Sequence, residues 1–160
     1  MEMRGEATLN IAAEPATVYS LISDVTRMGE WSPECIGCEW INGSSTAVVG
    51  AQFHGHNRNS GNEWTTPNTI IAADAGSEFA WVVGTPDFEV CRWRFVLEPT
   101  ADGTRVTESF ALGEVEVGFA QSVANASVHE RQTMVEHRRL QLIDGMEQTL
   151  ERLKAAAERG

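Results

Sequence analysis

Apolar and polar residues alternate along the central part of the chain with the two-residue period of a β-strand. Phe79, Trp81 and Val83, for example, fall on one side of one segment. Strands with one apolar and one polar face are typical of an antiparallel sheet that is covered on one side. Asn-Gly, Ser-Gly and Asp-Gly turns separate the segments. The pattern predicts strands at residues 4–11, 35–42, 47–57, 63–74, 77–84, 88–98 and 104–113.

Helical spacing of apolar residues marks other parts of the chain. Pro15 is suited to the first turn of a helix, and apolar residues recur at helical spacing through about Ser23. A second short helix or turn is expected at residues 25–29, and the proline-containing segment 31–33 is expected to be a loop. Strong helix formers and one apolar face predict a single long helix at residues 128–158.

The apolar stripe of this long helix must pack against another part of the chain. The concave apolar face of the sheet is the surface available to it. Residues 114–128, which precede the helix, are expected to be irregular or weakly helical. These elements predict an α+β fold in which a curved antiparallel sheet wraps around the C-terminal helix. The length of 160 residues fits one domain, over residues 1–160.

Charge and composition exclude several functional classes. The chain has a formal net charge of −11, and Lys154 is its only lysine. Nucleic acids and anionic lipid surfaces are bound by clustered Lys and Arg, so we expect neither as a partner. Residues 1–8 have no apolar core, and no segment approaches the ~18 apolar residues of a membrane span. We therefore expect a cytoplasmic protein without membrane insertion.

Four groups of short motifs, in this order and spacing, carry a resemblance to a known family. They are Pro-Ala-Thr-Val-Tyr at 15–19 with Asp-Val at 24–25 and Glu-Trp-Ser-Pro at 30–33; Gly-Ala-Gln-Phe at 50–53 with Gly55 and Asn-Arg at 57–58; Trp-Thr-Thr at 64–66 with Phe-Ala-Trp at 79–81; and Gly-Thr-Arg-Val-Thr-Glu-Ser at 103–109. Over nearly its whole length the sequence resembles the START-like (SRPBCC) superfamily, and in particular its bacterial polyketide cyclase/dehydrase branch. The resemblance implies the helix-grip fold, with a deep cavity between the sheet and the long helix.

The same resemblance implies a range of functions without choosing among them. Some family members close or dehydrate rings on polyketides, whereas others carry lipids, quinones or hormones without catalysis. Members often form dimers, which leaves a homodimer open for this chain. We expect the partner to be a small hydrophobic molecule, and we expect no cofactor.

Aromatic residues on the inward face of the sheet would give the implied cavity walls that suit a planar ligand. A filled core without a cavity is the alternative. The candidate ligand-binding residues are Phe53, Asn57, Trp64, Thr66, Phe79, Trp81, Trp93, Phe95, Val106, Phe110, Val135, Leu142 and Met146.

Two charged residues are the candidate catalytic pair. Alternation along the strand places Glu108 on the inward side with Val106 and Phe110, and the helical wheel places Arg139 within the apolar stripe. Buried charged groups are usually paired, so we expect Glu108 and Arg139 to form a pair inside the cavity. This pair either holds a carbonyl or hydroxyl group of the ligand or has a structural role.

Cys35 and Cys38 form a C-x-x-C motif, which is a candidate metal or redox site. Residues three apart on an extended strand face opposite sides, so the sequence predicts two unrelated thiols and no metal site. His54 and His56 share one strand face, which we expect to be the exterior of the sheet.

Three functions follow as alternatives. The first is a carrier or sensor that binds a small hydrophobic or aromatic molecule. The second is a polyketide cyclase or dehydratase, with Glu108 as the base and Arg139 or Asn57 as the donor that steadies the oxyanion, although the lack of an inward His weakens it. The third is a protein-interaction module with a vestigial pocket. A ligand bound without turnover would identify a carrier, turnover would identify an enzyme, and neither would identify an interaction module.

Overall fold

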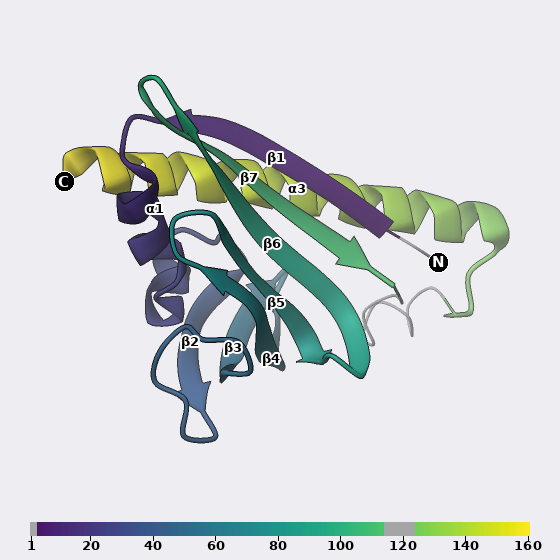
Figure 1. The fold of residues 1–160 in the computed structure, drawn as a ribbon. Helices are drawn as coiled ribbons and strands as arrows, with labels where there is room; N and C mark the ends of the chain where they lie inside the picture. The colour runs from purple at the N-terminus through teal and green to yellow at the C-terminus, as the bar shows by residue number, and fades with distance from the viewer. Residues whose placement is uncertain (1–2, 114–123) are drawn as a thin grey trace.

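The computed structural model describes residues 3–113 and 124–160, in which a curved antiparallel sheet wraps around one long helix (Figure 1). The strands are β1 (Met3–Ile11), β2 (Cys35–Ile41), β3 (Gln52–Asn59), β4 (Asn62–Asp74), β5 (Glu78–Thr85), β6 (Phe88–Thr100) and β7 (Gly103–Leu112). The helices are α1 (Pro15–Ile22), the 3-10 helix η1 (Val25–Glu30) and α3 (Val128–Arg159).

The strand order across the sheet is β1-β7-β6-β5-β4-β3-β2, and all neighbours are antiparallel. After β1, the segment containing α1 and η1 carries the chain to the opposite edge of the sheet, where β2 begins. The remaining strands return by hairpins, so that β7 ends beside β1. Met3 consequently pairs with Leu112.

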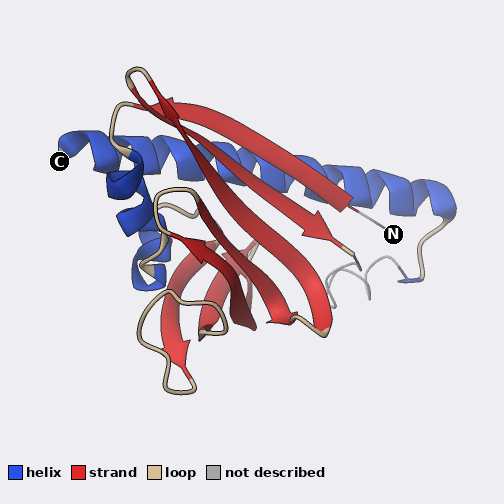
Figure 2. Cartoon of the chain, viewed as in Figure 1, coloured by secondary structure: helices blue, strands red, loops and turns tan. Residues whose placement is uncertain are grey.

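The core lies between the concave face of the sheet and one face of α3, as the layers in Figure 2 show. Apolar residues of α3 recur at helical spacing and are buried: Leu142, Met146, Leu150, Leu153 and Ala157. The inward positions of the strands supply the other side: Phe53, Ile70, Phe79, Trp81, Phe95, Val106, Phe110 and Leu112. Burial of each large side chain stabilises the fold by about 1.5–3 kcal/mol, so this interface fixes α3 on the sheet.

Local sequence signals set where the helices begin. Pro15 occupies the first turn of α1, where its missing N–H leaves no hydrogen bond unmade. Ser127 caps α3: its Oγ accepts a hydrogen bond from the Glu130 backbone N–H (3.2 Å), and the Glu130 side chain accepts one from the Ser127 N–H (2.9 Å). This reciprocal capping box satisfies two backbone donors at the start of the long helix.

The expected architecture is confirmed, with one strand shorter than the sequence predicts. The strand expected at 47–57 begins at Gln52, because Gly50 has a left-handed backbone (φ +91°) and the Gln52 N–H donates to Ser44 Oγ across the preceding loop (2.9 Å). Of the irregular stretch expected at 114–128, residues 114–123 lie outside the described part of the chain. Within the described residues, no helix combines the length and the apolar character needed to cross a membrane.

Candidate ligand-binding cavity

A cavity of about 120 Å³ lies between the concave face of the sheet and α3. It is lined by residues of α1, η1 and the following loop, β2 through β7, and α3: Ile22, Met28, Trp31, Ser32, Pro33, Glu34, Cys35, Cys38, Phe53, Gly55, Asn57, Trp64, Thr66, Asn68, Trp81, Val83, Trp93, Phe95, Glu108, Arg138, Leu142, Gly145, Met146 and Thr149. An apolar cavity of about 150 Å³ in an engineered protein binds benzene. The space therefore suits a ligand about the size of one ring.

Aromatic rings form one wall of the cavity, with Trp81 at their centre. The rings of Trp81 and Trp93 are stacked, with centroids 6.3 Å apart and planes at 15°. Phe53 meets Trp81 edge-on at 6.0 Å, and Phe95 lies 6.2 Å from it. These rings lie on β3, β5 and β6 of the same sheet, and the pleat points their side chains to one face, which is broad and apolar.

Glu108, on β7, is the acidic group inside this aromatic wall. The residue is only 6% exposed, and in the sheet it stands opposite Phe95 on one side and Ala7 on the other. Its Oε2 atom has no hydrogen-bond partner within the described residues. Burial away from water raises the pKa of this carboxyl well above its usual range, which favours the neutral, protonated form. A neutral carboxyl group can donate one hydrogen bond into the cavity.

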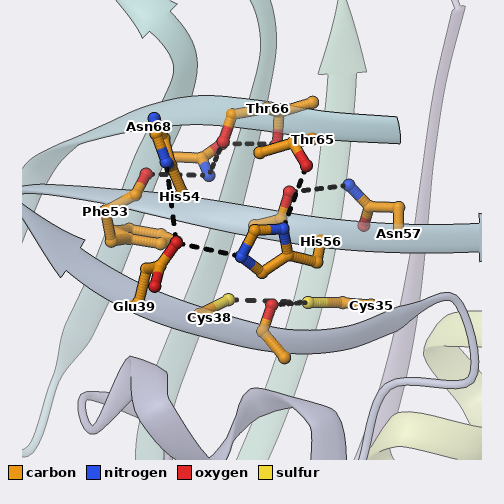
Figure 3. Close-up of polar contacts among 12 residues, drawn as sticks. Cys35, Cys38, Glu39, Phe53, His54, His56, Asn57, Thr65, Thr66 and Asn68 are labelled. Carbon is orange, nitrogen blue, oxygen red and sulfur yellow. Dashed lines mark hydrogen bonds and ion pairs between the residues drawn. The ribbon is translucent and has the colours of Figure 1, made fainter. Parts of the chain in front are cut away.

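Asn68 and Thr66, on β4, add amide and hydroxyl groups to the lining. Asn68 is buried, and its Nδ2 donates to the backbone carbonyls of Phe53 (3.3 Å) and Thr66 (3.1 Å), while its Oδ1 faces the Thr66 hydroxyl at 3.5 Å (Figure 3). Gly55 leaves the space for this pair, since a Cβ there would lie 3.3 Å from both Asn68 Nδ2 and Thr66 Oγ1. Hydrogen bonds to the backbone of β3 and β4 therefore fix the position of the Asn68 side chain.

An ion pair joins α3 to the loop before β2 at the side of the cavity. Arg138 is 6% exposed, and its guanidinium binds both carboxylate oxygens of Glu34, with Nη2–Oε1 at 2.6 Å and Nη1–Oε2 at 3.2 Å. Nη1 also donates to Gln141 Oε1 at 2.7 Å. A two-pronged contact of this kind fixes both orientation and distance. Arg138 therefore serves first to anchor the loop.

The loop after η1 closes one end of the cavity against α3. Trp31 is buried, its backbone carbonyl accepts a hydrogen bond from Arg152 (3.2 Å), and the Arg27 guanidinium lies 5.1 Å from its ring. Pro33 lies against Gly145 of α3, where a Cβ would meet Pro33 Cγ at 3.5 Å. Trp31 and Pro33 both line the cavity and hold the loop in place.

This arrangement of sheet, helix and cavity agrees with the protein family that the amino-acid sequence matches. Residues 3–158 match the family model described as "Polyketide cyclase / dehydrase and lipid transport". The chain belongs to this family. The comparison with curated proteins finds no match.

Solved structures extend the comparison. The solution structure of a polyketide-cyclase-like protein from Corynebacterium glutamicum is 33% identical over 99% of this chain and 93% of that one, with a TM-score of 0.68. The di-domain ARO/CYC protein StfQ of the steffimycin biosynthetic pathway has a TM-score of 0.76 and 13% identity, and this chain spans about half of its length (51%). Ginseng major latex-like protein 151 from Panax ginseng has a TM-score of 0.69 at 14% identity, over 98% and 97% of the two chains. The last two share the helix-grip fold with this chain.

The structure brings most of the sequence-predicted residues together around the cavity. Those that line it are Phe53, Asn57, Trp64, Thr66, Trp81, Trp93, Phe95, Glu108, Leu142 and Met146. The others belong to the surrounding core. Phe79 packs on Tyr19 and Trp81, Phe110 packs on Trp93, and Val106 and Val135 pack within the core beside them. Inward position on a strand was therefore not sufficient to place a side chain at the cavity.

The expected pairing of Glu108 with Arg139 is wrong. Arg139 lies outside the cavity lining, where its Nε donates to the backbone carbonyl of Arg4 (3.0 Å) and its Nη1 binds Glu136 (3.0 Å). The buried arginine is the preceding residue, Arg138, and its carboxylate partner is Glu34. One residue along a helix is a rotation of about 100°, which separates the position facing the cavity from the one facing β1.

The expectation that Cys35 and Cys38 face opposite sides of the strand is also wrong. The pairing register between β2 and β3 shifts between Cys35 and Gly37, which is a β-bulge. The extra residue returns both thiols to the inner face, with their Sγ atoms 3.5 Å apart. On the outer face, as expected, lie His54 and His56, whose rings are within 3.8 Å and 3.1 Å of Glu39 (Figure 3).

Sequence reasoning missed several lining residues for identifiable reasons. Met28 lines the cavity from η1, and Glu34 lines it from the loop after η1. These short segments show neither the strand nor the helix periodicity from which inward positions are predicted. Thr149 lies one turn beyond Met146 on the inward face of α3, and helical spacing alone would have found it. Val83 lies two residues after Trp81 on β5, so the alternation of the strand would also have predicted it as a lining residue.

Proposed function

We propose that the chain binds a compact, largely apolar molecule that carries a carbonyl or hydroxyl oxygen, as a carrier or sensor. Glu108 carries the proposal: its carboxyl group is buried in an aromatic wall, its raised pKa favours the protonated form, and one of its oxygens has no partner in the described chain. An unsatisfied buried polar group costs about 1–3 kcal/mol. A ligand oxygen that accepts a hydrogen bond from Glu108 would recover this cost, whereas a pure hydrocarbon would not.

The size and shape of the cavity support a flat ligand of one ring. The stacked pair Trp81 and Trp93 offers a flat apolar surface, and the volume of about 120 Å³ leaves little room beyond one ring. Asn68 and Thr66 add polar groups on the neighbouring strand. Family membership, with its description of cyclases, dehydrases and lipid transport, supports a small hydrophobic ligand.

The proposal is tested with two probes of the same shape, acetophenone and α-methylstyrene, which differ only in a carbonyl group. We expect both to raise the melting temperature and acetophenone to bind about 3- to 10-fold more tightly, the value of one net hydrogen bond. Glu108→Met should abolish this difference, because it removes the donor. Glu108→Gln should retain it, because the amide also donates. Isothermal titration and thermal unfolding measure both quantities.

Exposed Glu151, on α3 away from the cavity, supplies the matched control: Glu151→Met should behave as the parent protein does. Equal binding of the two probes by the parent protein, or no stabilisation by either, would refute the proposal. Native mass spectrometry of freshly purified protein, followed by organic extraction, would identify the chemical class of any ligand that remains bound.

A second candidate function is ring closure or dehydration, which the raised pKa of Glu108 favours. Such a reaction needs an acid for the departing hydroxyl group as well as a base. Because its raised pKa favours the protonated form, Glu108 suits the role of acid better than the role of base expected from sequence. Turnover of a bound β-hydroxyketone that is lost in Glu108→Gln, while binding persists, would distinguish an enzyme from a carrier.

A further inference from the structure

Three sulfur atoms meet at one wall of the cavity. Cys35 Sγ and Cys38 Sγ, both on β2, lie 3.5 Å apart, and Cys38 Sγ lies 3.8 Å from Sδ of Met28 on η1. The two cysteines are not joined by a disulfide, and Figure 3 shows their thiols pointing toward one another. All three residues line the cavity, so an ion could reach the sulfur atoms from it.

Two features of the backbone bring these sulfur atoms together. The β-bulge between Cys35 and Gly37 turns both thiols to the same side of β2. Gly29, next to Met28, lets η1 approach β2 closely, since a Cβ at this position would lie 2.5 Å from the carbonyl oxygen of Ile36. The backbone therefore brings these three side chains to the same place in the fold.

The spacing of the sulfur atoms matches that around a metal ion. Metal–sulfur bonds of about 2.3 Å give sulfur–sulfur separations of about 3.8 Å in a tetrahedral site and about 4.0 Å in a trigonal one. The separations of 3.5 and 3.8 Å are within a few tenths of an ångström of these values. Small side-chain movements would suffice to bind an ion.

We propose that Cys35, Cys38 and Met28 form a binding site for one Cu(I) ion. Thiolate and thioether sulfurs are soft ligands, and together they select Cu(I). A structural zinc site needs four ligands from Cys, His, Asp or Glu. Within residues 3–113 and 124–160, no group of three or more such side chains could hold a metal, whereas the thioether of Met28 completes a three-sulfur set. The proposal is independent of the small molecule proposed above.

Cys35 and Cys38 bind a metal ion as thiolates, so each thiol gives up its proton when the ion binds. Binding would therefore release protons to the solvent.

The first test is a competition titration under anaerobic, reducing conditions, in which the full chain withdraws copper from a Cu(I)–bicinchoninate complex. We expect one Cu(I) bound per chain. Cys35→Ser and Cys38→Ser should each weaken binding by about 100-fold or more, and Met28→Leu by about 10-fold, because the thioether is the weaker ligand. Cys91→Ala, a cysteine change outside the cavity lining, is the matched control and should leave the affinity unchanged.

Failure to withdraw copper would overturn the proposal, as would undiminished affinity in the two serine variants or equally tight binding of Zn(II). The second test needs no variant and so does not depend on how well a variant folds. X-ray absorption of the copper-loaded parent protein should show only sulfur in the first shell, at about 2.3 Å. Nitrogen or oxygen ligands in that shell would contradict a Cys35, Cys38 and Met28 site.

Discussion

Glu108 and Arg138 are residue types that proteins seldom bury, and the fold accommodates them by different means. Arg138 keeps its charge and pairs with both oxygens of Glu34. At Glu108, burial away from water raises the pKa of the carboxyl group and so favours its uncharged form. The arginine is therefore committed to a structural contact, and the carboxyl group remains available to a ligand.

The protonation of Glu108 predicts how stability changes with pH. Protonation of Glu108 favours the folded state, so its contribution is complete below the pKa of the unfolded chain and is lost as the pH rises through the raised folded pKa. Between these two values the free energy of unfolding should fall by up to about 1.4 kcal/mol per pH unit. Glu108→Gln removes this loss, so the variant should gain stability relative to the parent protein with rising pH.

Urea unfolding of both proteins from about pH 5 to about pH 9 measures the difference. Glu151→Gln serves as the control, since Glu151 is exposed on α3. Parallel pH profiles for the parent protein and Glu108→Gln would show that Glu108 is ionised in the folded state.

At the scale of elements, the contact between η1 and β2 determines one end of the cavity. Gly29 of η1 lies directly over the Ile36 carbonyl of β2. The loop that follows is fixed at its other side to α3 through Trp31, Pro33 and Glu34. The position of η1 therefore depends on close backbone packing at one glycine and on side-chain contacts to α3.

Two glycines in this region give a matched pair of substitutions. In Gly29→Ala the new Cβ would lie 2.5 Å from the Ile36 oxygen, so η1 must move away from β2, and we expect a loss of about 1–3 kcal/mol in the free energy of unfolding. In Gly37→Ala the new methyl group meets nothing within 4 Å, and we expect a change of less than about 0.5 kcal/mol. Urea unfolding of both variants checks the prediction, and equal effects would argue against the close η1–β2 contact.

At the scale of the whole molecule, the space between sheet and helix would limit the size of any ligand that binds there. The volume of about 120 Å³ is below the roughly 300–1,000 Å³ typical of pockets for drug-sized ligands. Residues on α3 form the wall opposite the aromatic rings, and among the apolar ones Met146 is flexible and unbranched, whereas Leu142 is branched. Shortening this side chain should enlarge the cavity directly.

Met146→Ala should therefore change both stability and ligand range. We expect a loss of about 2–4 kcal/mol in the free energy of unfolding, together with a new stabilisation by naphthalene, a ligand of two rings. Leu150→Ala is the matched control, because Leu150 is equally buried on α3 but does not line the cavity. It should lose similar stability without gaining a response to naphthalene. Naphthalene that stabilises the parent protein as strongly would contradict the size limit.

The sequence alone predicts the architecture well, for a physical reason. The two-residue period of positions such as Phe79, Trp81 and Val83 follows from a sheet with one covered face, and the stripe of Leu142 and Met146 follows from a helix that covers it. Both are local patterns. The aromatic wall of the cavity is predicted for the same reason, because an inward position on a strand is set by the residues beside it.

The polar contacts could not be predicted in this way, because they join distant parts of the chain. Arg138 and Arg139 are consecutive in the sequence, and only the partner Glu34, 104 residues from Arg138, identifies which of the two is buried. Cys35 and Cys38 meet because of a β-bulge, and a bulge adds one residue without a clear sequence signal. The ion pair depends on a contact between distant segments, and the meeting of the two thiols depends on an irregularity of the backbone. Neither follows from residue type.

The position of β1 also has a consequence for how the molecule forms. Hairpins between sequence neighbours can assemble β2 through β7 early, but β1 pairs with a strand about a hundred positions away, and closing so long a loop carries an entropy cost. Helix α3 follows every strand in the sequence, so it emerges from the ribosome after all of them. A nascent chain that has completed its sheet still exposes the aromatic wall of Trp81 and Trp93. Docking of α3 is therefore the step that covers this apolar surface and encloses the space between sheet and helix.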